Sequence, residues 1–141
     1  MVLDIEMAIL IALEAHKGQK DKGGNAYILH PLAVMNRVNS IEEKIVAVLH
    51  DVVEDSSITF EMLKQSGLED NLINVLKNVT KVEGESYIEF IERAKSNPIS
   101  RNVKIADIKE NINLSRIEKP NQKDYERIEK YKESLKYLLI D

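Results

Sequence analysis

The stretch SIEEKIVAVLHDVVED, residues 40–55, contains the best-defined helix pattern of the chain. Ser40 is followed three residues later by Glu43, and this spacing is the capping box that favours the start of a helix. An apolar face follows at helical spacing, made of Ile45, Val46, Val48, Leu49, Val52 and Val53. The pattern predicts one amphipathic helix that ends near Asp55 and turns this face toward a core.

Other helix signals lie on both sides of this segment. Glycines, prolines and capping residues divide the chain into helical patterns, which include about residues 3–17, 98–116 and 121–139. We find no segment with the alternation of a β-strand and no internal repeat. The sequence therefore predicts an all-α fold, in which residues 1–141 form a single compact bundle of about seven helices.

Composition excludes several classes of function. The 141 residues fit one domain, and a net charge of -4 does not favour binding to a nucleic-acid backbone. Because there is no cysteine, disulfides, thiolate metal sites and cysteine nucleophiles are excluded. The apolar run over residues 7–13 continues in helical rhythm into charged residues, unlike a signal peptide or a membrane span. We expect a cytoplasmic protein with no nucleic-acid or membrane partner.

Four ionisable side chains crowd the polar edge of the helix predicted over residues 40–55. They are His50, Asp51, Glu54 and Asp55. Such a stripe is most often a solvated helix face. A divalent cation is the alternative explanation, because it would relieve the repulsion among the three carboxylates.

Two residues elsewhere in the chain favour the metal interpretation. His30 lies at the junction of a loop and a helix that begins with proline, so its backbone is fixed by the helix. Asp107 lies in a long helical pattern, with Asn111 four residues later on the same face. With the adjacent His and Asp of the polar stripe, these residues form a two-imidazole, two-carboxylate set that suits Mn²⁺, Fe²⁺ or Zn²⁺. We expect His16 to pack or hydrogen-bond instead, and leave it out of this set.

Five short motifs follow one another over about residues 10–116. They are His16-Lys17-Gly18-Gln19, Tyr27-Ile28-Leu29-His30-Pro31, Leu49-His50-Asp51-Val52-Val53-Glu54-Asp55, Val79-Thr80-Lys81 and Lys104-Ile105-Ala106-Asp107. In this order and spacing the motifs resemble the hydrolase domain of the RelA/SpoT alarmone enzymes and their small stand-alone relatives, which are HD-domain phosphohydrolases.

The resemblance implies a site and a reaction. It implies that one divalent cation, Mn²⁺ in those relatives, is held by His30, His50, Asp51 and Asp107. It implies that Glu54 and Asp55 orient or deprotonate a metal-activated water, and that Lys22, Lys81 and Asn111 contact the substrate. The expected substrate is a small-molecule nucleotide, guanosine tetra- or pentaphosphate, which would lose pyrophosphate from its 3′ position.

One departure from this resemblance keeps other functions open. Asp21 stands in the loop where the alarmone enzymes usually have a basic residue. The first alternative is an HD-type nucleotidase with the same metal chemistry and another specificity. The second is a catalytically silent metal-binding module that senses a nucleotide, although the presence of both Glu54 and Asp55 argues against it. A homo-oligomer is compatible with the sequence.

Overall fold

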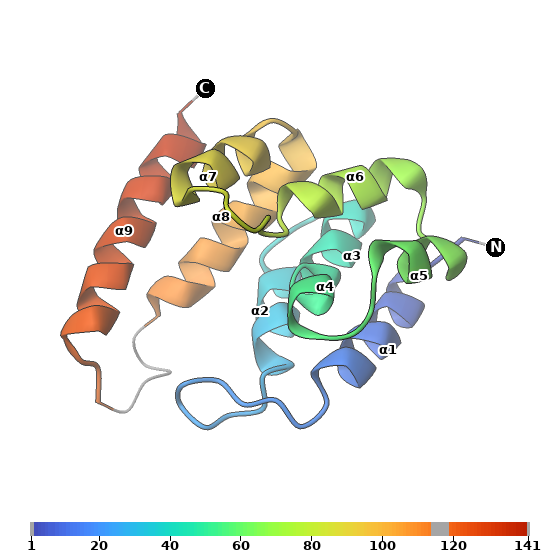
Figure 1. Ribbon diagram of the computed structural model, residues 1–141, viewed down its shortest axis with the longest axis horizontal. Helices are drawn as coiled ribbons and strands as arrows, with labels where there is room; N and C mark the ends of the chain where they lie inside the picture. The colour runs from blue at the N-terminus through green and yellow to red at the C-terminus, as the bar shows by residue number, and fades with distance from the viewer. Residues whose placement is uncertain (1, 114–118, 141) are drawn as a thin grey trace.

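The computed structural model describes residues 2–113 and 119–140, and within these ranges the regular structure is entirely helical (Figure 1). The described helices are α1 (Ile5–His16), α2 (Leu29–Asn36), α3 (Ile41–Leu49), α4 (Val52–Asp55), α5 (Phe60–Gln65), α6 (Asp70–Asn78), α7 (Tyr87–Lys95), α8 (Pro98–Ile112) and α9 (Gln122–Leu139). The predicted all-α fold is confirmed. The expected extension of the helix at 98–116 beyond residue 113 lies outside the described residues.

Side-chain caps start most of these helices where the sequence predicted them. The capping box predicted at Ser40 and Glu43 starts α3, and further capping boxes start α7, at Ser86 with Glu89, and α9, at Asn121 with Asp124. Pro98 occupies the first turn of α8, where a missing N–H leaves no helix bond unmade. None of the described helices is long and apolar enough to cross a membrane.

The helix predicted over residues 40–55 is broken into two, which is one reason why nine helices replace the expected seven or so in the described chain. α3 ends at Leu49, and α4 begins at Val52 after Asp51 adopts φ −107° and ψ 0°. His50 Nδ1 lies 2.6 Å from the carbonyl oxygen of Ala47. In a continuous helix this carbonyl would accept from the Asp51 N–H. The side chain of His50 therefore replaces a helix hydrogen bond at the break.

The arrangement of helices places α3 and α8 against each other at the centre. α3 packs against α1, α2, α6 and α8, and its apolar face is almost fully buried. On the other side of α8, helix α9 packs along α8 and α7 around Ile91, Ile108 and Leu138 (Figure 1). The start of α2, the α3–α4 break and the middle of α8 consequently face one another.

Candidate metal centre and substrate pocket

Three buried side chains, two on helices and one at the break after a third helix, meet at this central point. His30 comes from the first turn of α2, His50 from the residue that follows α3, and Asp107 from α8. Each residue offers a ligand atom, and these atoms all lie within 4.8 Å of one another. The sequence predicted these three residues as metal ligands, and the fold brings them together.

The hydrogen bonds of the two histidines leave ring nitrogens directed at this centre. His30 Nε2 lies 2.9 Å from Asp107 Oδ1. The Nδ1–H of His50 donates to the Ala47 carbonyl, which leaves Nε2 as the ring atom available for a metal. His50 Nε2 is buried and makes no hydrogen bond within the described structure. It lies 3.0 Å from Asp51 Oδ2 and 3.3 Å from Asp107 Oδ1. Because an imidazole nitrogen and carboxylate oxygens converge in a buried place, the residues present fit a bound cation.

The electrostatics of the cluster also favour a cation. Burial opposes a charge on His50, but Asp51 and Asp107 outweigh it and raise the pKa of the imidazole well above its ordinary value. Burial likewise opposes ionisation of Asp107, yet Lys104 and His50 hold its pKa well below the ordinary range. The carboxylate of Asp107 is therefore ionised in a buried place, where a divalent cation would be strongly attracted.

Asp51, the fourth predicted ligand, lies beside the cluster. Its Oδ2 is 3.0 Å from His50 Nε2 and accepts a hydrogen bond from the Tyr27 hydroxyl. Burial raises the pKa of Asp51, but His50 outweighs it and lowers the value to about 2. The geometric cluster consists of His30, His50 and Asp107, so the ligand role of Asp51 stays a prediction.

Glu54 and Asp55, the predicted catalytic pair, lie on the short helix α4 next to the cluster. Both line the same cavity as Asp51 and Asp107. Burial, followed by the charge of Asp51, raises the pKa of each carboxyl group above its ordinary value. A carboxylate with a raised pKa is a stronger base, which is the property that proton abstraction from water requires.

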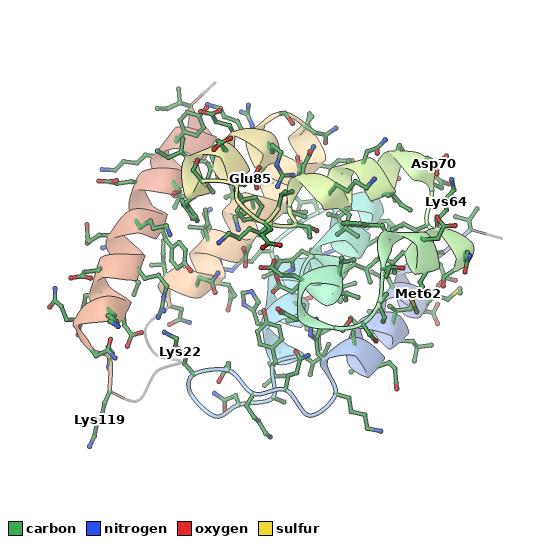
Figure 2. All side chains as sticks on the ribbon, viewed as in Figure 1. Lys22, Met62, Lys64, Asp70, Glu85 and Lys119 are labelled. Atoms are coloured by element: carbon green, nitrogen blue, oxygen red, sulfur yellow. The ribbon has the colours of Figure 1, made fainter. Side chains whose placement is uncertain are left out.

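His30 and Asp107 of the cluster line a cavity of about 570 Å³. All three residues predicted to contact the substrate line this cavity. Asn111 donates to Asp107 Oδ1 at 3.1 Å, which places it against the metal cluster. Lys22 extends from the loop toward the start of α9, where its ammonium group lies 3.2 Å from Asp124 (Figure 2). The exposed Lys81 reaches the cavity from the segment before α7.

The structure agrees with the role expected for His16 and adds two residues that sequence reasoning missed. His16 is buried, and its Nδ1 lies 2.9 Å from the side-chain oxygen of Gln19. Tyr27 and Lys104 were quoted in motifs without a role. Tyr27 donates to Asp51, and the Lys104 ammonium group lies 3.0 Å from Asp107 Oδ2. Their positions within the motifs, three residues before His30 and three before Asp107, were the available signal.

Comparisons with known proteins point to one group of enzymes, although no family model matches the chain. A guanosine-3′,5′-bis(diphosphate) 3′-pyrophosphohydrolase of Aquifex aeolicus is 30% identical over 121 residues, which cover 77% of this chain and 17% of the relative. The bifunctional (p)ppGpp synthase/hydrolase SpoT of Escherichia coli is 37% identical over 65 residues, which cover 43% of this chain and 9% of the relative.

A solved structure supports the fold. It is a metazoan ortholog of SpoT that hydrolyses ppGpp, with a TM-score of 0.79 and 22% identity, covering 96% of this chain and 84% of that one. This likeness shows that the chain has the helical fold of that structure. More particularly, its sequence is similar to one segment of enzymes named for the hydrolysis or synthesis of guanosine alarmones. The chain spans less than a fifth of the length of these curated relatives.

Proposed function

We propose that this protein is a metal-dependent phosphohydrolase of the HD-domain type that removes pyrophosphate from the 3′ position of guanosine 3′,5′-bis(diphosphate). The observation that carries the proposal is the convergence of His30, His50 and Asp107 beside a cavity rich in lysine, which His30 and Asp107 line. The curated relatives that bear the same activity in their names support the choice of substrate.

The metal proposed for this site is Mn²⁺, held by His30, His50, Asp51 and Asp107. A mixed set of imidazole and carboxylate ligands suits this ion. When bound, a divalent cation lowers the pKa of a water molecule and neutralises negative charge on a phosphate group. The ring nitrogen of His50 and the ionised carboxylate of Asp107 are the donors best prepared for it.

The residues around the ligands have three roles in hydrolysis: proton transfer, orientation of the nucleotide and positioning of a ligand. Glu54, assisted by Asp55, accepts a proton from the attacking water. The oxygen of this water forms a bond to phosphorus, the bond from phosphorus to the ribose 3′ oxygen breaks, and the ribose oxygen takes up a proton. Lys22, Lys81 and Asn111 orient the nucleotide. Tyr27 keeps Asp51 directed toward His50 through its hydrogen bond.

The Asp21 carboxylate is used within its own loop. Its Oδ1 accepts hydrogen bonds from the backbone N–H groups of Gly23 and Asn25, both at 2.9 Å. The carboxylate thus shapes the loop that carries Lys20 and Lys22, as Asp does in many turns. We therefore expect alarmone hydrolysis to persist despite this departure, with weaker discrimination against related nucleotides.

The test is an assay of the purified, Mn²⁺-loaded protein against a panel of nucleotides. We expect release of pyrophosphate from the guanosine alarmone, abolished by a chelator and restored by Mn²⁺. Efficient hydrolysis of nucleoside monophosphates with the alarmone untouched would replace the proposal by the nucleotidase alternative. Tight binding of the alarmone with no hydrolysis of any nucleotide would favour the silent sensing module.

A further inference from the structure

One wall of the cavity is basic and aromatic. It is formed by Lys81, by Tyr87 at the start of α7, by Lys104 on α8 and by Lys130 on α9. The ammonium group of Lys130 lies 3.8 Å from the centre of the Tyr87 ring. The ammonium group of Lys104 lies 4.5 Å from the centre of the Phe90 ring and also pairs with Asp107. Lys104 therefore connects this wall to the metal cluster.

The charges around the cavity are unbalanced in favour of an anion. Six cationic side chains and five carboxylates line it, although the whole chain has a net charge of -4. A bound divalent cation would add two positive charges at the carboxylate side. The cationic charges would then outnumber the carboxylates by three, which favours a polyanionic ligand.

Two of these cations stand outside the ion pairs of the described residues. Neither Lys81 nor Lys130 forms an ion pair with any residue in the described part of the chain. Burial, together with the charges of Lys81 and Lys104, lowers the pKa of Lys130. The charges of the three lysines are thus close enough to affect one another. Like charges in such a position repel, and an anion between them would remove the repulsion.

The Tyr87 hydroxyl gives an independent sign of a missing ligand. Its oxygen is buried and has no hydrogen-bond partner within the described residues. Buried hydroxyl groups normally have a partner, which comes from the protein, from water or from a ligand. An anion bound by Lys130 would supply the acceptor, because the ammonium group of Lys130 lies over the Tyr87 ring.

We propose that Lys81, Tyr87, Lys104 and Lys130 form a distal anion subsite, which binds the phosphate group next to the one held at the metal centre. The ligand class is a pyrophosphate group. Its first phosphate would lie at the metal centre. Its second would pass Lys104, which adjoins Asp107, and contact the other lysines of the subsite. In the context of the proposed function, on which this identification of the group rests, the subsite holds the leaving pyrophosphate. It would favour substrates that carry a diphosphate at the attacked position over those that carry one phosphate.

The test compares the binding of inorganic phosphate and inorganic pyrophosphate to the Mn²⁺-loaded protein by calorimetry, without any turnover. We expect the unaltered protein to bind pyrophosphate about tenfold or more tightly than phosphate, as one additional charge-assisted contact predicts. The K130Q variant should lose about tenfold in pyrophosphate affinity and keep its phosphate affinity. The Y87F variant keeps the ring under Lys130 and removes the hydroxyl, so we expect a loss of about threefold.

The matched control is K132Q, which removes an exposed lysine two residues further along α9 that does not line the cavity. This variant should bind both anions like the unaltered protein. An unchanged preference for pyrophosphate in K130Q, or an equal loss in K132Q, would overturn the subsite. If the preference behaves as expected and no alarmone is hydrolysed, the subsite stands and the proposed function fails.

Discussion

At the scale of single residues, Glu54 is the side chain on which turnover should depend most. Its raised pKa suits a base, and the isosteric amide cannot accept the proton of a water molecule. We expect E54Q to keep its fold and bound metal and to lose about 100-fold or more in kcat. The matched control is E61Q on α5, which alters an exposed glutamate outside the cavity and should leave kcat unchanged. Near-normal turnover by E54Q would remove Glu54 from catalysis.

His50 should decide whether the centre holds a metal at all. Its buried Nε2 lies 3.3 Å from Asp107 Oδ1, and the geometric cluster offers only two further ligand residues. We expect H50A to lose most of its bound Mn²⁺, as measured by elemental analysis after gel filtration, while its helical circular dichroism is retained. Full metal occupancy in H50A would contradict the ligand assignment.

The identities of these residues could be predicted from the sequence, but part of their surroundings could not. The motifs contain His30, His50 and Asp107, and the resemblance connects them, so the cluster was predictable. Lys130 and Tyr87 carry no local signal, because they meet only through the packing of α9 on α7. A contact between residues so far apart in the chain depends on the tertiary fold and leaves no spacing pattern.

At the scale of helices, the break after Leu49 shows how a strong pattern hides a functional detail. The apolar positions continue in helical rhythm from Ile45 to Val53, so periodicity predicts an unbroken helix. The hydrogen bond from the His50 ring to the Ala47 carbonyl replaces a helix bond, and Asp51 leaves the helical conformation. This interruption lets neighbouring His50 and Asp51 approach one centre, whereas on a continuous helix they would diverge by about 100°.

The contact between α3 and α8 gives a prediction at the same scale. Glu43 caps α3, is almost fully buried, and its Oε2 accepts a hydrogen bond from Asn102 on α8 at 2.8 Å. Burial raises the pKa of Glu43, but hydrogen bonds from Ser40 and Asn102 outweigh it, and the folded pKa lies below its ordinary value of 4.5. A lowered pKa means that this carboxylate stabilises the fold above pH 4.5 and loses its contribution as the pH falls through the folded pKa.

We therefore expect E43Q to lower the free energy of unfolding by about 1–2 kcal/mol at neutral pH, with a smaller difference in acid. Urea unfolding of both proteins across the acid range measures this dependence. The neighbouring E42Q variant, which changes an exposed carboxylate of the same turn, serves as the control and should have little effect. A difference for E43Q that does not change with pH would mean that the carboxylate charge is not the source of its stabilisation.

At the scale of the whole molecule, the centre connects elements that are distant in the chain. His30, His50 and Asp107 lie on α2, after α3 and on α8, so a bound cation would join three helices at one point. The same three helices also contribute apolar side chains to the core. The fold therefore positions the ligands before any ion binds, and binding should add to the stability of the entire domain.

Metal binding should thus be visible as thermal stabilisation, whichever nucleotide the protein hydrolyses. A ligand that binds only the folded state, present at about 100 times its dissociation constant, stabilises it by about 2.7 kcal/mol. For a chain of this size such a gain corresponds to a rise in Tm of about 5–10 °C. We expect this rise when Mn²⁺ is added to chelator-treated protein, and its loss when the chelator is returned. H50A should show little or no rise, because it lacks a ligand, whereas E54Q should respond like the unaltered protein, because Glu54 is not one. Equal Mn²⁺-dependent shifts in H50A and the unaltered protein would place the ion outside the predicted centre.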